Sequence, residues 1–378
     1  MRIAYLNFGP QSGVTESFMR GLTALGHSVL NVDAMGPLEW RDRQTRALRA
    51  SAGAALGLAV SALEYGRHAV ARRWNTSYAF DAHTRNAGEK LDGLSADVVL
   101  QNGALFAPGA PPRLPYVLVL DNTCRIAARQ KSYPDAGFGA PYRFGAEWLR
   151  RETALYRGAR AVCSFSRVVR DSVVDDYGIS PLRAHVIGAG ANMFPAEPVR
   201  RHDGNTFLFV GKVFSRKGGF VLLRAFEQLR KQRPAARLLI VGPSQQPAPM
   251  PEGAEFLGPR TFSQVQELFA QASALVLPTL REPFGIAYLD ALACGVPCIG
   301  TRVGAVPETL EDGRYGLLVP PADADALAEA MRVLLDDPAR AEAMGAAGRR
   351  KVADRCRWEH VVQRLVPLLE GEAGKSAA

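Results

Sequence analysis

Two carboxylates lie beside a predicted helix start in residues 276–321. Glu282 comes just before a helix that we expect at 285–293, and Asp290 lies within the first two turns of that helix. The first N–H groups of a helix have no partner inside it and carry partial positive charge, so they suit an anion. Gly285 has no Cβ, which lets a ligand approach the backbone closely. These features predict a site that binds hydroxyl groups beside an anion.

Several short motifs occur in this stretch in a fixed order. They are Glu282-Pro283-Phe284-Gly285, Ala293-Cys294-Gly295-Val296-Pro297, Gly304, Pro307-Glu308, Asp312-Gly313 and Gly316-Leu317-Leu318-Val319-Pro320. Together they resemble the donor-binding segment of retaining nucleotide-sugar glycosyltransferases with the GT-B fold, the group 1 family. That family carries two glutamates separated by seven residues; Glu282 matches the first, and Asp290 stands in the place of the second. The resemblance is strong from residue 206 to about 357 and weak in the first half.

The resemblance implies a role for each of these residues. Glu282 would position the donor sugar, and Asp290 would bind the ribose hydroxyls, although either acid alone would be interpreted as an ordinary surface residue. Lys212 and Lys217 would neutralise the donor diphosphate. Relatives have arginine where this chain has Lys212, and an ammonium group cannot bind a phosphate bidentately. The other donor-binding residues that the resemblance implies are Gly211, Phe284, Gly285, Ile286 and, near the nucleobase, Arg260.

Candidate residues in the first half follow two predicted strands. Gly13 ends a glycine-bearing turn after a strand at 3–8, and this turn either meets a phosphate or acceptor group or is a plain tight turn. Asp121 follows a strand at 116–120, where the family often has a histidine. Ligands of open parallel sheets lie beyond the carboxyl ends of the strands. Asp121 is therefore a candidate polar contact or base, with a helix cap or turn residue as the alternative.

The order of the predicted elements favours an α/β protein. Strand-like runs alternate with helical stretches, which is typical of parallel sheets covered by helices. The length of 378 residues fits about two domains. We expect two doubly wound, Rossmann-like domains facing a cleft, the GT-B arrangement that the resemblance implies. The expected parts are an acceptor-binding domain at 1–195, a donor-binding domain at 203–357, a helix at 358–370 that returns to the first domain, and a tail at 371–378.

Positive charge is concentrated in the first half. The chain has a net charge of +9, of which residues 1–195 contribute +7. A small, apolar helix is predicted at 50–63, and it is too short to span a bilayer. It either lies in the interface of an anionic membrane or packs on the sheet with a solvated basic face. The arginines that flank it are Arg41, Arg43, Arg46 and Arg49 on one side and Arg67, Arg72 and Arg73 on the other.

Composition favours a cytoplasmic protein without a metal site. The five cysteines are odd in number and lack metal-ligand spacing, and the first residues predict a strand rather than a signal peptide. Asp323 and Asp325 follow two prolines and begin a helical run, so we interpret them as helix-cap acids rather than a metal pair. Basic residues are not interleaved with aromatic ones, so no nucleic-acid partner is expected.

The resemblance therefore predicts transfer of a sugar from a UDP-, GDP- or ADP-linked donor to a sugar, glycan or lipid-linked acceptor, with retention of anomeric configuration. No metal or other cofactor is expected, and the inner face of the membrane is a further expected contact. Two alternatives remain open at this stage. One is a nucleotide-sugar epimerase of the same fold, and the other is a non-catalytic basic binding protein.

Overall fold

The computed structural model describes residues 1–9, 13–34, 52–139, 143–197 and 202–371. They divide into two compact units, each of which is discontinuous in sequence. The first unit consists of Met1–Arg129, Tyr142–Ile187 and the chain from Val362 onward. The second consists of Gln130–Pro141 and Gly188–Val361. Gln130–Pro141 therefore belongs to the second unit, although the residues before and after it in the sequence belong to the first.

Six parallel strands form the sheet of the first unit, in the order β2-β1-β3-β4-β5-β6. The chain moves from β1 to β2 on one side and then to β3 on the other, so the direction of winding reverses between β1 and β3. Strands β3, β4 and β5 are buried along their full length, as expected where helices cover both faces of a parallel sheet. The bounds are β1 (Arg2–Asn7), β2 (Ser28–Asp33), β3 (Val98–Asn102), β4 (Tyr116–Leu120), β5 (Ala161–Ser164) and β6 (Ala184–Val186).

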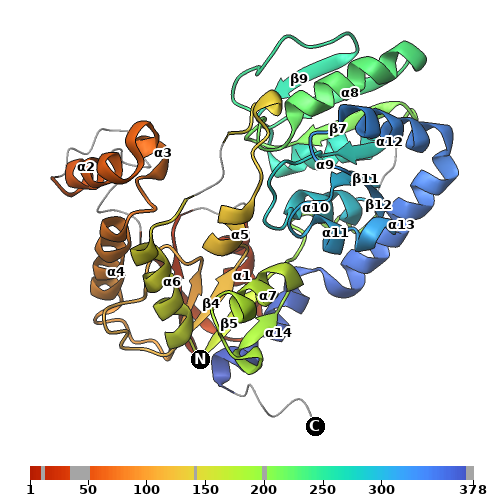
Figure 1. The fold of residues 1–378 in the computed structure, drawn as a ribbon. Helices are drawn as coiled ribbons and strands as arrows, with labels where there is room; N and C mark the ends of the chain where they lie inside the picture. Colours follow the sequence, from red (N-terminus) through yellow and green to blue (C-terminus); the bar gives the residue numbers. More distant parts are fainter. Residues whose placement is uncertain (10–12, 35–51, 140–142, 198–201, 372–378) are drawn as a thin grey trace. The chain divides into compact units, whose positions relative to one another are not determined.

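Side-chain caps and aromatic packing position the helices of this unit. The Thr76 hydroxyl caps α4 by accepting a hydrogen bond from the Ala79 N–H at 3.0 Å. Phe80 of α4 meets Trp148 of α6 edge to face, with ring centroids 5.5 Å apart, so the two helices pack together (Figure 1). The helices are α1 (Val14–Ala24), α2 (Ala52–Tyr65), η1 (Gly66–His68), α3 (Ala69–Arg72), α4 (Ser77–Leu91), α5 (Cys124–Arg129), α6 (Ala146–Gly158), α7 (Arg167–Asp175) and η3 (Pro181–Arg183).

The apolar helix expected at 50–63 is α2, whereas the arginines at 41–49 lie outside the described residues. The last helix, α14 (Trp358–Glu370), begins in the second unit and ends in the first. Its Arg364 Nε donates to the Ile187 carbonyl at 2.8 Å, which ties it to the end of β6. No helix in the described ranges is long and apolar enough to span a bilayer.

The second unit also contains six parallel strands, in the order β12-β11-β10-β7-β8-β9. The chain proceeds from β7 through β8 to β9 on one side, and then from β10 through β11 to β12 on the other. The winding therefore reverses between β7 and β10. The bounds are β7 (Thr206–Val210), β8 (Arg237–Val241), β9 (Ala254–Gly258), β10 (Ala274–Val276), β11 (Cys298–Thr301) and β12 (Gly316–Val319).

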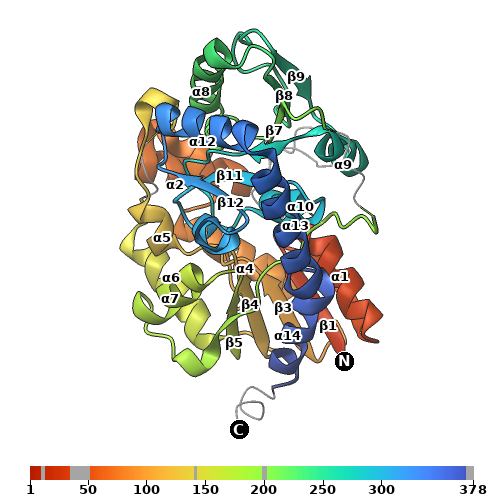
Figure 2. The ribbon, with the colours of Figure 1, turned by 90° about the vertical axis from the view of Figure 1, so that its right-hand side faces the viewer.

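Helices cover this second sheet, and α12 packs on α8 while α13 packs on α10 (Figure 2). Asp323 caps α12 by accepting from the Ala326 N–H at 2.9 Å, in agreement with its interpretation as a cap. The two sheets with their helices confirm the predicted pair of doubly wound α/β domains. The helices are η2 (Pro134–Ala136), α8 (Gly219–Gln232), α9 (Phe262–Gln271), α10 (Ile286–Ala293), α11 (Val306–Thr309), η4 (Glu311–Gly313), α12 (Ala324–Asp336) and α13 (Pro338–Arg355).

Candidate functional site

The candidate site lies where the winding of the second sheet reverses. The loop after β7 carries Lys217, and the loop after β10 carries Glu282. Because β7 and β10 are neighbouring parallel strands, both loops leave the same edge of the sheet. Ligands of open α/β sheets bind at this kind of reversal, beyond the carboxyl ends of the strands.

Lys217 and Glu282 form a buried ion pair at this edge. The Lys217 ammonium donates a hydrogen bond to Glu282 Oε2, and only 11% and 6% of the two side chains are exposed. Burial lowers the pKa of Lys217, while the negative charge of Glu282 opposes that shift. Both residues were predicted from the sequence as site residues. The structure places them in contact although they are 65 residues apart in the chain.

Arg216 lies on the other oxygen of the same carboxylate. Its Nη1 is 3.8 Å from Glu282 Oε1 and donates a hydrogen bond to the Arg281 carbonyl at 3.0 Å. One carboxylate therefore lies between two cations, so the cluster carries a net positive charge. Arg216 was not predicted as a site residue from the sequence, although its position directly before Lys217 was a usable signal.

Glycines let the loops of the site approach one another closely. Gly218 has φ 75° at the start of α8, and a Cβ there would lie 1.8 Å from the Pro278 carbonyl oxygen. A Cβ on Gly304 would likewise lie 1.8 Å from the Glu282 carbonyl oxygen. Only glycine fits at either position. The chain therefore places the loops after β7, β10 and β11 in direct backbone contact around Glu282.

Asp290 is buried in α10 and holds a neighbouring segment of backbone. Its Oδ1 accepts hydrogen bonds from the N–H groups of Asn192 at 2.6 Å and Met193 at 3.2 Å. Burial raises the pKa of Asp290 to about 7, and these two hydrogen bonds oppose the shift. The carboxylate thus ties residues 192–193 to α10, a contact that the sequence did not predict. Its role in binding ribose stays a prediction.

The other donor-binding residues fall into two groups. Phe284 is buried, Gly285 is the left-handed N-cap of α10, and Ile286 is its first residue, so these three adjoin Glu282. Lys212 is exposed in the loop that starts at Gly211 after β7. Arg260 is exposed after β9, the edge strand, and β8 separates that strand from β7. The residues beside the ion pair are therefore Phe284, Gly285, Ile286 and Gly211, where a Cβ would lie 2.8 Å from Lys217 Cγ.

The two candidates from the first half lie in the first unit. Gly13 has φ 79° and is the N-cap of α1. Asp121 is exposed directly after β4, but the cap of α5 is Thr123, whose hydroxyl accepts from the Ile126 N–H at 3.2 Å. The role of Asp121, as a polar contact or as a cap or turn residue, stays a prediction.

The buried carboxylate of Glu152, which was not predicted from the sequence, forms hydrogen bonds that hold the backbone following Asp121. Glu152 of α6 accepts hydrogen bonds from the hydroxyls of Tyr156 at 2.8 Å and Tyr177 at 2.5 Å. It also accepts from the Cys124 N–H at 3.2 Å, at the start of α5. This network fixes the backbone at the carboxyl end of β4. An acid on the apolar face of the amphipathic stretch Ala146–Gly158 was the available signal.

Comparisons with known proteins agree with this geometry. Residues 204–337 match the family model for glycosyl transferases group 1. Most of the second unit is therefore similar to group 1 glycosyltransferases. The chain is 33% identical over 248 residues to a GDP-mannose-dependent α-(1-6)-phosphatidylinositol monomannoside mannosyltransferase of Mycolicibacterium smegmatis, a match that covers 58% of this chain and 65% of the relative. It is 36% identical over 175 residues to a monoacylated-substrate counterpart of Corynebacterium glutamicum, covering 43% of this chain and 46% of that protein.

Solved structures of glycosyltransferases share the fold over the full length. Sucrose-phosphate synthase from Thermosynechococcus elongatus superposes with a TM-score of 0.72 at 20% identity and covers all of both chains. Anabaena Alr3699/HepE in complex with UDP-glucose gives a TM-score of 0.67 at 16% identity and covers 98% of this chain and 99% of that one. The predicted GT-B fold is thus confirmed. The sequence matches to the two mannosyltransferases span only about half to two-thirds of their length.

A further segment reaches the site region of the second unit. Residues 130–139 lie between α5 and α6, yet Gly137 packs against Phe220 of α8. The Arg281 guanidinium lies over the ring of Phe138, 4.9 Å from its centroid. Since Arg281 directly precedes Glu282, this segment contacts the loop that carries the ion pair. Nothing in the local sequence indicated this placement.

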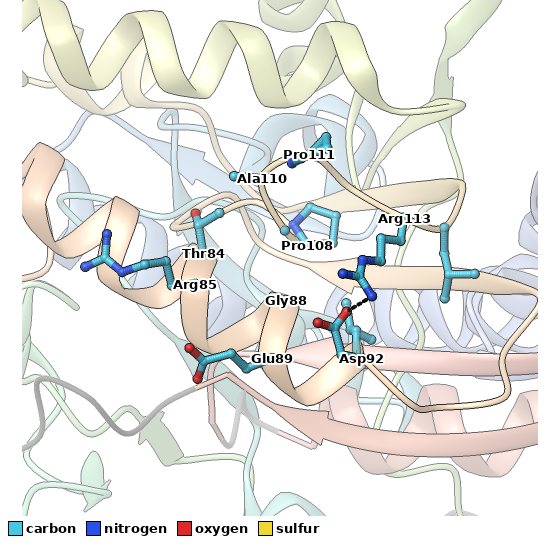
Figure 3. A pocket seen from close by; sticks show the side chains of 12 residues that line it. Thr84, Arg85, Gly88, Glu89, Asp92, Pro108, Ala110, Pro111 and Arg113 are labelled. Atoms are coloured by element: carbon cyan, nitrogen blue, oxygen red, sulfur yellow. Dashed lines mark ion pairs between the residues drawn. The ribbon is translucent and has the colours of Figure 1, made fainter.

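One cavity lies apart from all these residues (Figure 3). It has a volume of about 260 Å³ and lies in the first unit, between the second half of α4 and residues 108–114. Arg113 and Asp92 form an ion pair at 3.0 Å in its wall, with both side chains largely exposed. None of the predicted site residues lines this cavity.

Proposed function

We propose that this protein transfers a hexosyl group from a nucleotide sugar to an acceptor with retention of anomeric configuration. The observation that carries the proposal is the cationic cluster around Glu282 at the reversal point of the second sheet. The similarity of residues 204–337 to group 1 glycosyltransferases supports the same reaction. The second unit holds the donor, and the first holds the acceptor.

The main chemical task of the site is to stabilise the departing diphosphate. Lys212, Lys217 and the N-terminal amides of α8 and α10 supply positive charge and hydrogen-bond donors for the oxygen that becomes the leaving group. Glu282 positions the donor sugar, and Asp290 binds the ribose hydroxyls. Asp121 is the polar contact on the acceptor side. No protein carboxylate is required as a nucleophile.

The donor carries UDP, GDP or ADP, and the acceptor is a sugar, a glycan or a lipid-linked molecule. The Mycolicibacterium relative is described as GDP-mannose-dependent and as acting on a phosphatidylinositol mannoside, and the Anabaena structure contains UDP-glucose. Both descriptions fit a site with cations for a diphosphate and carboxylates for hydroxyls.

Incubation with a panel of UDP-, GDP- and ADP-sugars tests the proposal. We expect one nucleotide series to bind and its sugar to be released slowly by hydrolysis, because water replaces the missing acceptor. Formation of a new sugar isomer would instead identify an epimerase. Absence of binding to every member of the panel would favour a non-catalytic protein. Analysis of the product anomer with a working acceptor then tests retention.

Activity is expected to persist in excess chelator. The lysines and helix amides can balance the diphosphate charge without a divalent ion. Initial rates should be compared in EDTA, in magnesium and in manganese, with the same donor and acceptor concentrations. A rate that vanishes in EDTA and returns with either metal would contradict this prediction.

We also propose peripheral contact with the cytoplasmic face of an anionic membrane through α2. Six apolar residues on this helix are exposed at helical spacing, and Leu56 and Leu63 are 51% and 89% exposed. This spacing places them on one face of the helix. Arginines flank the helix in sequence, and basic residues are attracted to anionic lipid. The six residues are Ala52, Ala55, Leu56, Ala59, Ala62 and Leu63.

The purified protein is therefore expected to pellet with anionic vesicles and to be released by salt, which screens surface attraction. Replacing both Leu56 and Leu63 by glutamate should reduce pelleting. The matched control is Leu182→Glu, because Leu182 is an 82% exposed leucine of the same unit outside α2. Equal partitioning onto neutral and anionic vesicles would favour the solvated-face interpretation.

A further inference from the structure

Among the described residues beside Glu282, Arg216 keeps donor nitrogens available for a ligand. The ammonium of Lys217 and the carboxylate of Glu282 form a buried pair, and such a pair is neutral as a whole. Its attraction for a bound diphosphate is therefore smaller than that of an isolated lysine. A donor in its ground state needs positive charge beyond this neutral pair. Arg216, directly before Lys217 and 3.8 Å from the second Glu282 oxygen, can supply it.

Arg216 is held by one edge of its guanidinium and keeps the other edge available. Nη1 makes its contacts with the Arg281 carbonyl and Glu282 Oε1. Among the described residues, Nε and Nη2 have no hydrogen-bond partner, and 25% of the side chain is exposed. The planar guanidinium is thus fixed in orientation while two of its donor nitrogens remain unused. Two such donors match two oxygens of a phosphate.

The backbone around Arg216 fixes this position further. The Arg216 carbonyl accepts hydrogen bonds from the Leu280 N–H at 2.9 Å and the Thr279 hydroxyl at 3.3 Å. Residues 279–280 come from the loop after β10, so both main chain and side chain of Arg216 are joined to the loop that carries Glu282. A guanidinium preorganised in this way loses little further freedom when it binds a ligand.

We propose that Arg216 binds the diphosphate of the donor through Nε and Nη2, and that it supplies more of the ground-state affinity than Lys217 does. The inference rests on the proposed function, because it assumes a diphosphate-bearing ligand at this site. It also supplies the bidentate contact that the ammonium of Lys212 cannot make.

Calorimetric binding of UDP, UMP, GDP, GMP, ADP and AMP to the full chain tests the assignment. Arg216→Gln is expected to weaken binding of the preferred diphosphate by about 10- to 100-fold, the range for a lost charged hydrogen bond. The affinity ratio of diphosphate to monophosphate should also fall, whereas a general distortion of the site would lower both affinities and leave the ratio unchanged. Arg216→Lys should show an intermediate loss of diphosphate affinity, since lysine keeps the positive charge but cannot donate two parallel hydrogen bonds as a guanidinium does. Arg224→Gln is the matched control, because Arg224 is exposed on α8 outside the cluster.

The outcomes separate the two proposals. If the unmodified protein binds a nucleoside diphosphate and Arg216→Gln keeps both its affinity and its ratio, the role of Arg216 is wrong and the proposed function stands. If the unmodified protein binds none of the nucleotides, both are wrong. Should thermal unfolding show that Arg216→Gln does not fold, Arg216→Lys decides the matter, and unchanged diphosphate selectivity in that variant would overturn the assignment.

Discussion

Replacing Lys217 by alanine is expected to reduce the turnover number by about 100-fold or more, with a smaller loss of nucleotide affinity. As the sugar–phosphate bond breaks, negative charge grows on the leaving oxygen. An interaction that strengthens at that moment lowers the barrier, whereas an equal interaction in the ground state lowers only KM. Loss of one preorganised donor to a developing oxyanion typically costs about 100- to 1,000-fold. Because Glu282 neutralises Lys217 in the ground state, the structure strengthens this expectation.

The same substitution should also destabilise the second unit. Removing one partner of a buried ion pair typically costs about 3–5 kcal/mol. Here Arg216 still lies 3.8 Å from the remaining Glu282 carboxylate, so the expected cost is at the lower end of that range. A double variant, Lys217→Met with Glu282→Gln, removes both charges and should recover much of that stability while remaining inactive. Turnover, donor KM and urea unfolding are the measurements. Retained turnover with only a raised donor KM would show that Lys217 serves binding alone.

Asp290 is expected to make the protein less stable as the pH rises from about 4 to 7. Burial raises its folded pKa to about 7 from an ordinary value of 3.8. The folded state therefore holds its proton more tightly than the unfolded state does, so the stabilisation is complete below pH 4 and lost as pH approaches 7. The difference of about three pKa units corresponds to about 4 kcal/mol of unfolding free energy.

The unmodified protein alone cannot isolate this effect, because a buried histidine acts in the opposite direction. Burial lowers the pKa of His83 from 6.5 to about 4, which makes stability rise with pH over that interval. The measurement is thus the difference in unfolding free energy between the unmodified protein and Asp290→Asn from pH 4 to 8. Asparagine keeps an acceptor for the N–H groups of Asn192 and Met193 and cannot titrate. Parallel curves for the two proteins would contradict the prediction.

Local sequence signals were sufficient for the elements that carry the site. The strand predicted at 116–120, directly before Asp121, agrees with β4 at Tyr116–Leu120. The prediction of a helix at 285–293 agrees with α10, whose N-cap is Gly285. Such elements can be predicted because each signal involves only a few neighbouring residues. The signals are the hydrophobic period, a glycine at a left-handed position and an acid at a helix cap. The order of strands and helices then restricted the fold to two parallel sheets.

Contacts between distant positions were beyond these signals. Arg216 meets Glu282 across 66 positions, and Asp290 meets Asn192 across 98. A single sequence does not indicate which distant residues will be in contact, because the conformation of the loops decides which side chains meet. Arg216 was therefore not predicted as a site residue. Asp290 was predicted to bind ribose, but its hydrogen bonds to the backbone of residues 192–193 were not predicted. The placement of residues 130–139 in the second unit was missed for the same reason.

The position of α14 has a consequence for the order in which the chain can fold during synthesis. The first unit includes residues from Val362 onward, and Arg160 donates to the Leu369 carbonyl. When Ile187 leaves the ribosome, more than 170 residues must still be made before this last piece arrives. At about 5–20 residues per second, that interval lasts roughly 10–40 s. The newly made first unit must therefore wait, with the surface for α14 uncovered, until the entire second unit has emerged.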